Sequence, residues 1–555
     1  MNLREPSANH RWLNIPTPTL ALYNTSHDAR HTASLRIAAE RLLREVGNWD
    51  FYQRWFTHFI PSVMSMQRRG FGHLDRGRRF DIYKRLRHEM REVEHEALAC
   101  TGMFGELVAA EHAFAAAFDT ETQHEVEKRQ AEARTWAAES ARRNPDARLR
   151  KVDEWAAKRP AARERKLNSM KRGRLLRRAR FFNMSKDLKN VAFDELGLKP
   201  APKTRDRAER SLEQGSLLYI LSHMRKCDEP ATPFLHALCH RSRIRTITQR
   251  YMRFWVDGDD RVYPTINCAS ARTMRLAYSE PSLQQWPAEI RSMIVAKPGH
   301  VFVSFDYSQI EARIFAYEAN DRLMLEGFAA FDAIEDKKSL EALRVEVHAA
   351  NARQRGNMTW EQWQALPGEV RAKHRTGAKR FLYRLLYGGS DDSEKIETFC
   401  PCVRCVEKVP QTLDQPARER ILAQQRWLAA HPAVQTWQDS WPNACHWRGD
   451  RYTSRFGYTH HFNDPWPSSR TQMLNHPMQH GASQVIGRAM EQLTAYGREV
   501  PLVLQMHDNL IAEVPEGGAD MTYAYMKGCM EQPIPEYGGM VFPVEGKCGY
   551  DWGQV

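Results

Sequence analysis

A chain of 555 residues is long enough for several domains and can bury a core without disulfide bonds. Its 81 Lys and Arg residues outnumber its 68 Asp and Glu residues, and the resulting net charge of +13 favours a polyanionic partner. Ten cysteines, no basic and apolar leader in residues 1–30 and no apolar run of 18 residues argue against a disulfide-stapled, exported or membrane-spanning protein, and they predict a reduced, soluble protein of the cytoplasm.

The first 180 residues offer helical patterns and one strongly basic segment. Residues 1–55 contain a helix-like stretch around residues 33–46, and no role can be assigned to them. Residues 106–180 are predicted to be helical, and between residues 161 and 180 nine Lys and Arg residues stand against the single acid Glu164. Such a run is usually a solvated helix face, and its alternative role is to neutralise the phosphates of a nucleic acid.

The stretch from Val301 to Asn320 is the most informative part of the chain. Its apolar run Val-Phe-Val-Ser-Phe predicts a buried strand that ends at Asp306, and a helical pattern that contains Glu311 follows. A strand that ends on a carboxylate presents a rigid anionic oxygen at the rim of a sheet, where a hard divalent cation can be held. An Asp in this position is more often a cap or a turn residue, so a second acid is needed to indicate a site.

A basic and aromatic helix is predicted at residues 375–388. Four side chains recur every four residues, and this spacing brings them to one broad helix face: Arg375, Lys379, Tyr383 and Tyr387. A guanidinium and an ammonium one turn apart suit a polyphosphate, and the neighbouring rings suit a base or a sugar. The alternative is a solvated basic stripe beside ordinary core tyrosines.

A cysteine cluster follows this helix. Cys402 and Cys405 have the spacing of a zinc-binding pair, and Cys400 and Cys445 could complete a set of four ligands. Because Cys445 is followed directly by His446 and not by a spaced second pair, ordinary reduced cysteines are the alternative.

A second acid lies far downstream, within residues 502–514. Two short apolar runs flank His507 and Asp508, which predicts a β-hairpin with the acid at its tip. Asp306 and Asp508 become informative as a pair because the basic helix lies between them in the sequence.

These segments resemble the motifs of DNA polymerase family A, the Pol I-like enzymes. Asp306-Tyr-Ser-Gln-Ile-Glu311 is similar to motif A, residues 375–388 are similar to motif B, and Gln505-Met-His507-Asp508 is similar to motif C. Residues 273–285 and 475–479 resemble two further blocks, which precede the palm and motif C in the family. Five blocks in the family's order within about 240 residues argue strongly against a chance match.

The resemblance implies an α+β, right-hand polymerase fold with an antiparallel sheet in the palm and helical fingers and thumb. The implied domains follow in chain order: a leader at 1–55, the thumb and the start of the polymerase region at 56–250 with a basic helical insertion at about 106–180, the first part of the palm with motif A at 251–345, the fingers with motif B and the cysteine-rich insertion at 346–470, and the second part of the palm with motif C at 471–555.

No proofreading exonuclease is expected, because too little chain precedes residue 56 for such a domain. Phe118-Asp119-Thr-Glu121 spells the first carboxylate motif of such an exonuclease, but it lies in helical sequence and does not follow a strand, so we interpret it as a coincidence. The size and the missing exonuclease are typical of a phage or mobile-element enzyme.

The resemblance further implies a site for two Mg²⁺ ions, for which Mn²⁺ is expected to substitute. Asp306 and Asp508 would bridge the ions, and the backbone carbonyl of Tyr307 would complete one shell. Lys379 would neutralise the triphosphate and protonate the leaving pyrophosphate, so it is the third predicted catalytic residue. The predicted dNTP contacts are Arg375, His348, Tyr383, Glu311 and Gln309.

Two of these residues are expected to set sugar selectivity. Glu311 matches the residue that crowds the sugar 2′ position and excludes ribonucleotides, and the tyrosine form at Tyr383 is expected to tolerate dideoxynucleotides. The predicted primer-template contacts check pair shape more than base identity. They are Arg275, Tyr387, Arg384, Asn475, Gln479 and His507, together with Arg174, Arg177 and Arg178 of the basic insertion.

Two departures from the family pattern keep alternatives open. Arg384 stands where the family nearly always has Gly, and Asn509 replaces the Glu that normally follows the Asp of motif C. A catalytically silent DNA-binding protein is therefore one alternative to a DNA-directed DNA polymerase. A single-subunit RNA polymerase is the other, because that class shares the two acids and the helix, although Glu311 speaks against it. By analogy with phage members, a processivity factor is an expected partner at the thumb insertion.

Overall fold

The computed structural model describes residues 29–99, 103–139, 145–183, 185–198, 201–204, 207–213, 216–217, 220, 231–254, 256, 258–337, 339–387, 417–464, 466–495 and 499–555. The chain forms two compact units. The first comprises residues 1–78, 254–391 and 412–555, and the second comprises residues 79–253 and 392–411. Within the described ranges, every helix is too short or too polar to cross a membrane.

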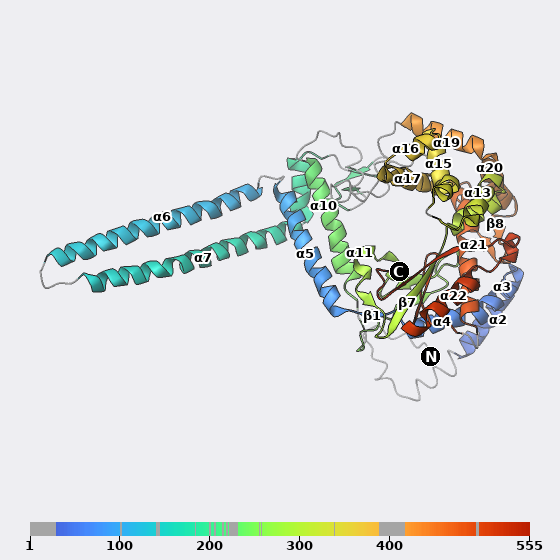
Figure 1. Cartoon of the computed structure of the whole chain (residues 1–555), viewed down its shortest axis with the longest axis horizontal. Helices are drawn as coiled ribbons and strands as arrows, with labels where there is room; N and C mark the ends of the chain where they lie inside the picture. The colour runs from blue at the N-terminus through green and yellow to red at the C-terminus, as the bar shows by residue number, and fades with distance from the viewer. Residues whose placement is uncertain are drawn as a thin grey trace. The chain divides into compact units, whose positions relative to one another are not determined.

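A four-stranded antiparallel sheet organises the first unit (Figure 1). The strands lie side by side in the order β10 (Leu502–Met506), β11 (Asn509–Pro515), β7 (His300–Tyr307) and β12 (Val544–Gly549). The runs in β7, β10 and β11 are almost entirely buried, as continuous apolar sequence predicts. Met506 pairs with Asn509, so the predicted hairpin is confirmed and Asp508 lies in its turn.

Helices hold the ends of these strands in place. α12 (Ile310–Glu318) follows β7 directly and packs against α21 (Arg470–Leu493). Gln309, at the junction, has a left-handed backbone with φ of 57°, which turns the chain from the strand into the helix. α22 (Ala519–Met530) packs against β7 and β12, and a 3₁₀ turn on either side, at Glu516–Gly518 and Pro535–Tyr537, connects it to its neighbours.

A group of helices in the same unit carries the predicted basic and aromatic helix, which is α17 (Gly368–Leu386). α17 packs against α15 (Val347–Gly356) through a small core in which Ala349 and Ala378 allow close approach. The prediction of a helix at motif B is therefore confirmed. The other helices of this group are α13 (Arg322–Ala333), α14 (Leu340–Val345), α16 (Trp360–Ala365), α19 (Ala417–Ala430) and α20 (Pro432–Trp447).

The N-terminal helices belong to this unit as well. The helix expected near residues 33–46 is α2 (Ala29–Glu45), and Asn48 follows it. Asn48 Nδ2 donates to the carbonyl of Thr459 at 2.8 Å, and Asn48 Oδ1 accepts from the amide of Thr459 at 2.6 Å. These two bonds tie the start of the described chain to a strand 411 residues away. After Asn48 come α3 (Trp49–Arg54), a π-helical turn (Trp55–Phe59) and α4 (Ile60–Arg69).

Short two-stranded sheets complete the first unit. Thr459 begins β9 (Thr459–His461), which pairs with β8 (Arg451–Thr453). The other pairs are β1 (His73–Leu74) with β6 (Ile294–Val295) and β4 (Thr265–Asn267) with β5 (Ala277–Ser279); a 3₁₀ turn (Leu283–Gln285) and α11 (Ala288–Arg291) lie between β5 and β6.

The second unit is mostly helical, and its longest elements form an antiparallel hairpin of α6 (Met103–Ala138) and α7 (Asp146–Asn183) (Figure 1). The expected helical character is thus confirmed for residues 106–138 and 146–180. Arg163 pairs with Asp119 at 3.0 Å, and the Arg159 guanidinium lies 4.1 Å from the ring centre of Phe118. The other elements are α5 (Arg76–Ala99), which begins in the first unit, α8 (Ser185–Asn190), π-helical turns at Val191–Glu195 and Ile247–Tyr251, β2 (Ala201–Thr204) with β3 (Arg207–Glu209), and α10 (Ala231–Thr246).

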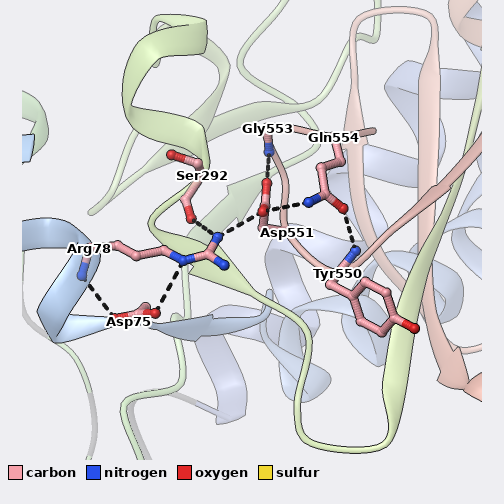
Figure 2. A network of polar contacts seen from close by, with 7 residues as sticks. All are labelled: Asp75, Arg78, Ser292, Tyr550, Asp551, Gly553 and Gln554. Atoms are coloured by element: carbon pink, nitrogen blue, oxygen red, sulfur yellow. Dashed lines mark hydrogen bonds and ion pairs between the residues drawn. The ribbon is translucent and has the colours of Figure 1, made fainter.

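A network of polar contacts holds the last residues of the chain (Figure 2), and Asp551 forms a β-bridge with Val295 of β6. Arg78 Nη1 donates to Asp551 Oδ2 at 2.7 Å and to the carbonyl of Ser292 at 3.0 Å. Asp551 also accepts hydrogen bonds from Gly553 N and Gln554 Nε2 at 2.9 and 3.0 Å. Because this carboxylate is nearly buried and both of its oxygens are hydrogen-bonded, the network fixes the end of the chain that follows β12.

Trp552, which follows Asp551 in the sequence, is part of the buried core. Its side chain is 1% exposed and lies edge-on to Phe71, with ring centres 5.0 Å apart. Trp286 lies 5.7 Å away, and the Arg291 guanidinium lies 5.0 Å from the Trp552 ring centre. The aromatic side chain therefore joins α11, the segment before β1 and the end of the chain.

We expect Trp552→Ala to lower the free energy of unfolding by about 3–5 kcal/mol, because a large buried ring is replaced by a cavity. Tyr550, two residues earlier, is 58% exposed and gives a matched control. Tyr550→Ala should change stability by no more than about 0.5 kcal/mol. Urea unfolding followed by circular dichroism measures both, and equal losses in the two variants would show that the ring does not anchor the core.

Candidate active site

The two predicted acids lie at one rim of the central sheet. Asp306 is the penultimate residue of β7, and the strand register places it between Asn509 on β11 and Glu545 on β12. Asp508 occupies the turn before β11, and its backbone carbonyl accepts a hydrogen bond from the amide of Tyr307 at 3.0 Å. Neighbouring strands of one sheet therefore hold the two carboxylates, as a shared cation site requires.

The electrostatic surroundings of both acids disfavour their charged forms. Burial, followed by the carboxylates of Glu311 and Asp306, raises the pKa of Asp508 to about 7. Protein atoms crowd Asp306 although its side chain reaches solvent, and this burial, together with Glu545, raises the pKa of Asp306. Asp508 Oδ1 is buried and has no hydrogen-bond partner. These features fit a divalent cation. A bound cation would offset the repulsion between the carboxylates and would give the unpaired oxygen a partner.

The residues present fit an open cation site and not a closed one. Within the described ranges, no three His, Cys, Asp or Glu side chains surround a common point. Mg²⁺ is often held by one or two carboxylates together with water and substrate phosphates, so two acids at a rim are sufficient protein ligands. Glu545 adds a carboxylate opposite Asp306 that the sequence did not indicate, because only strand pairing brings β12 beside β7.

The predicted face of α17 is turned toward the acids. Lys379 lowers the pKa of both Asp306 and Asp508, so its positive charge is felt at both carboxylates. Burial raises the pKa of Tyr383, and nearby carboxylates, Asp508 and Asp306 among them, raise it further. Lys379 Nζ lies 5.9 Å from the ring centre of Tyr383, and the rings of Tyr383 and Tyr387 are 6.3 Å apart. Lys379 and Tyr383 thus lie within electrostatic reach of both acids, and the ring of Tyr387 lies next to Tyr383.

Arg375 forms an ion pair that the sequence did not reveal. Its Nε and Nη2 donate to the two carboxylate oxygens of Glu346 at 3.0 and 3.1 Å. Gln309 Nε2 donates to the same carboxylate at 3.4 Å. His348, two residues after Glu346, is buried with both ring nitrogens unpaired, and burial lowers its pKa to about 4. Three of the predicted dNTP contacts therefore gather around Glu346, and the only sequence signal for it is its place in the Glu-Val-His pattern.

The predicted primer-template contacts in this unit lie on several elements. Arg275 forms an ion pair with Glu311, so a predicted groove contact and the predicted sugar contact are joined to each other. Asn475 and Gln479 are four residues apart on α21 and share one helix face. The exposed His507 lies in the hairpin turn with φ of 54°. The last turn of α17 carries another of the predicted contacts, Arg384.

Some predicted residues lie outside the described part of the structure, and one lies in a different part of the fold. The side chains of the predicted DNA contacts in α7 lie outside the described residues, as do three of the four cysteines: Arg174, Arg177 and Arg178, and Cys400, Cys402 and Cys405. Cys445 is fully buried against Tyr452, Phe462 and Met473, and burial raises the pKa of its thiol to about 12. A thiol held in its neutral form is a poor zinc ligand, and zinc binding by this cluster stays a prediction.

A column of stacked rings braces α21 beside the predicted primer contacts. His476 stacks on His460 with ring centres 4.1 Å apart and on His480 at 5.5 Å, and Tyr458 continues the column 4.9 Å from His480. Burial is the main cause that lowers the pKa values of these histidines, to about 2 for His476, about 3 for His480 and about 4 for His460. The column therefore consists of neutral imidazoles. The four-residue spacing of His476 and His480 was visible in the sequence, but their partners, His460 in β9 and Tyr458 just before it, were not.

An antiparallel sheet with two acids at its rim, faced by a helix with basic and aromatic side chains, defines a right-hand polymerase fold. The polymerase domain of Pol1 from M. smegmatis, solved in a complex with a DNA primer-template and a dNTP, has this fold. Its TM-score to this chain is 0.61, at 18% sequence identity, over 94% of this chain and 74% of that one. At this low identity the likeness concerns the fold alone.

Sequence comparison identifies the family. Residues 162–554 match the model of DNA polymerase family A, and the chain belongs to this family. A thermostable DNA polymerase I from Thermus filiformis is 26% identical over 391 residues, which are 67% of this chain and 41% of that protein. DNA polymerase I from Mycobacterium bovis is 28% identical over 390 residues, 66% of this chain and 37% of that protein. The chain thus spans about two fifths of the length of the curated relatives it matches.

The histidine column predicts a loss of stability in acid. Each ring has a folded-state pKa below its unfolded value of about 6.5, so the unfolded chain binds more protons, and stability falls as the pH drops below about 6.5. At pH 5 the expected loss is about 2 kcal/mol for each of His476 and His480. His476→Phe keeps a ring in the stack and removes one titrating group, so the urea midpoint should depend less steeply on pH between 5 and 7.

The control is His461→Phe, because His461 is exposed on β9 next to the column. This variant should keep the pH dependence of the wild-type protein. If His476→Phe also kept it, the column would not be the source of acid sensitivity.

Proposed function

We propose that the chain extends the 3′ end of a DNA primer along a DNA template by adding dNTPs. The observation that carries the proposal is the meeting of Asp306, Asp508 and the Lys379 face of α17 at one sheet rim, in a chain of DNA polymerase family A. The activity named for the matched relatives supports it, as does the primer-template and dNTP complex of the similar fold.

Asp306, Asp508 and the backbone carbonyl of Tyr307 would hold two Mg²⁺ ions, or Mn²⁺ in their place, which when bound stabilise charge on the attacking 3′ oxygen and on the leaving pyrophosphate. The unpaired Asp508 Oδ1 and the raised pKa values of both acids support this assignment. Asn509, in place of the family's usual Glu, donates to Ser304 Oγ at 2.8 Å and so braces β11 on β7. In this role Asn509 helps to position the two acids, but it supplies no further carboxylate to the metal site.

Residues from two helices would bind the triphosphate. Lys379 neutralises the phosphates and can donate its proton to the leaving pyrophosphate, while Arg375 clamps the outer phosphates. His348 is a neutral imidazole, so it can donate one N–H to a phosphate oxygen without carrying charge. Its two unpaired ring nitrogens, and the buried and unpaired Oε1 of Gln309, support a ligand at this place.

The remaining side chains would select the sugar and the base pair. Glu311 crowds the 2′ position, Tyr383 lies under the sugar, and Tyr387 closes the pocket near the templating base. Contacts to the primer end and the minor groove would come from Arg275, Asn475, Gln479 and His507, and Arg384 would meet a template phosphate. Such contacts check pair geometry, which suits an enzyme that copies every sequence.

The basic end of α7 would hold duplex phosphates through Arg174, Arg177 and Arg178, and the hairpin of α6 and α7 is the proposed place for a processivity factor. We propose that the chain has no proofreading of its own, since Asp119 of the exonuclease-like pattern lies inside α6, where it pairs with Arg163. A phage or mobile-element origin, and a place in the cytoplasm of the cell that carries it, complete the proposal.

Primer extension tests the two acids directly. Asp306→Asn and Asp508→Asn should each lower the extension rate with Mg²⁺ by at least about a thousandfold, because several kcal/mol of charge stabilisation are lost. Binding of primer-template DNA, measured by gel shift, should persist. The control Glu516→Gln removes an exposed carboxylate at the opposite end of β11 and should extend normally. Extension that survives in both Asn variants would place the chemistry elsewhere, and a wild-type protein that binds DNA but never extends it would be a silent binder.

Sugar selection separates a DNA polymerase from an RNA polymerase. The wild-type protein should prefer dNTPs on a primed DNA template, and Glu311→Ala should reduce that preference by roughly 10- to 100-fold, because space opens at the 2′ position. Glu318→Ala, two turns further along α12, should leave the preference unchanged. A wild-type preference for rNTPs would favour the RNA polymerase alternative instead.

A further inference from the structure

Glu346 is a buried carboxylate at the junction of three elements. It is the N-cap residue of α15, where its Oε2 accepts a hydrogen bond from the amide of Ala349 at 2.8 Å. Its side chain is 4% exposed. Ser, Thr, Asp and Asn are the preferred N-cap residues, and neighbouring helices of this unit are capped by Asp321, Ser339 and Thr359. A glutamate is longer than capping requires, and its second oxygen reaches other partners.

Those partners come from the two motifs that face each other across the site. Arg375 on α17 donates Nε and Nη2 to the two oxygens of Glu346, at 3.0 and 3.1 Å. Gln309, in the turn between β7 and α12, donates its side-chain amide to Oε1 at 3.4 Å. One carboxylate thus joins the turn after Asp306, the start of α15 and the middle of α17. Each oxygen accepts two hydrogen bonds, so its capacity is used.

The contact leaves part of the guanidinium available. A guanidinium has five N–H donors in a rigid plane, and Glu346 takes one from Nε and one from Nη2. Both Nη1 hydrogens and one Nη2 hydrogen are left for another acceptor. The Arg375 side chain is 46% exposed, so this free edge is accessible from solvent, while its partner carboxylate is buried. A ligand phosphate can therefore bind Arg375 without displacing Glu346.

We propose that Glu346 is a positioning residue for the incoming nucleotide, which holds the fork of Arg375 in the orientation that receives the outer phosphates. The proposal rests on the proposed polymerase function, since it concerns the same triphosphate site. Without Glu346 the long side chain of Arg375 would sample many rotamers, and ordering it would cost entropy each time a nucleotide binds. Glu346 therefore acts on nucleotide affinity, and the turnover rate at saturating nucleotide depends on it far less.

Two variants of Glu346 distinguish its role in positioning Arg375 from its role as the N-cap of α15. Glu346→Gln keeps an oxygen for the amide of Ala349 and loses the charge that orders Arg375. Glu346→Ser supplies a preferred N-cap but is too short to reach Arg375. Both should raise KM for dNTPs by about 10- to 100-fold, the range expected when a charge-assisted contact is lost, and change kcat by less than about threefold. The dissociation constant for primer-template DNA should stay near the wild-type value.

The matched control is Glu318→Gln. Glu318 also holds an arginine with both oxygens, since Arg455 Nε and Nη2 donate to it at 2.7 and 3.2 Å, and it is similarly shielded from solvent. Its loss should leave KM and kcat unchanged. If KM in Glu346→Ser equals that of the control, Glu346 is only a helix cap and the proposal is overturned.

A double-mutant cycle tests whether Glu346 works through Arg375. In an Arg375→Ala background, Glu346→Gln should add less than about a twofold further change in KM, because the group it orients is gone. A full, multiplicative effect in that background would overturn the proposal. These outcomes are distinct from failure of the polymerase function itself, which would appear as no extension by the wild-type protein at any dNTP concentration.

Discussion

The register between β7 and β11 is the constraint on which the site depends. In this pairing Asp306 lies opposite Asn509, and Asp508 comes immediately before Asn509 in the turn. A slip of one residue would turn every side chain of a strand to the other face and separate the two acids. Because the acids repel each other and lose hydration, the pairing must supply the free energy that keeps them together. Burial of the apolar runs in both strands provides it.

Polar contacts around the rim make that register specific. Asn509 donates to Ser304 on β7, and Tyr307 donates its amide to the carbonyl of Asp508. On the other side, Gln309 and Glu346 connect the turn after β7 to α15 and α17. The turn that follows Asp306 thus belongs to a network of hydrogen bonds that includes α17, the proposed phosphate-binding helix. A departure from the family pattern, Asn509, takes part in the polar contacts around the rim, which gives the substitution a physical reason.

The sequence predicted those parts of the molecule in which local pattern decides structure. The hairpin at residues 502–514 and the helix that bears Lys379 could be predicted because the spacing of their residues is regular. The contact of Glu346 with Arg375 and the place of Glu545 beside Asp306 were not predicted, since each depends on a partner from another element. The histidine column was not predicted for the same reason: His460 comes from β9, which is only three residues long, and Tyr458 comes from the residue just before that strand. Contacts between elements that lie far apart in the sequence leave no regular spacing of residues from which they could be predicted.

The paired hydrogen bonds of Asn48 set a limit on how far the protein can be trimmed. Its side-chain amide mimics a strand edge for Thr459, whose amide and carbonyl it satisfies at once. α2, by contrast, is largely exposed along its length. Removal of α2 would therefore take away little buried structure, whereas removal of Asn48 would take away the two hydrogen bonds that hold β9 and would loosen the stacked imidazoles next to it. A minimal version of this chain would therefore begin at the end of its first described helix.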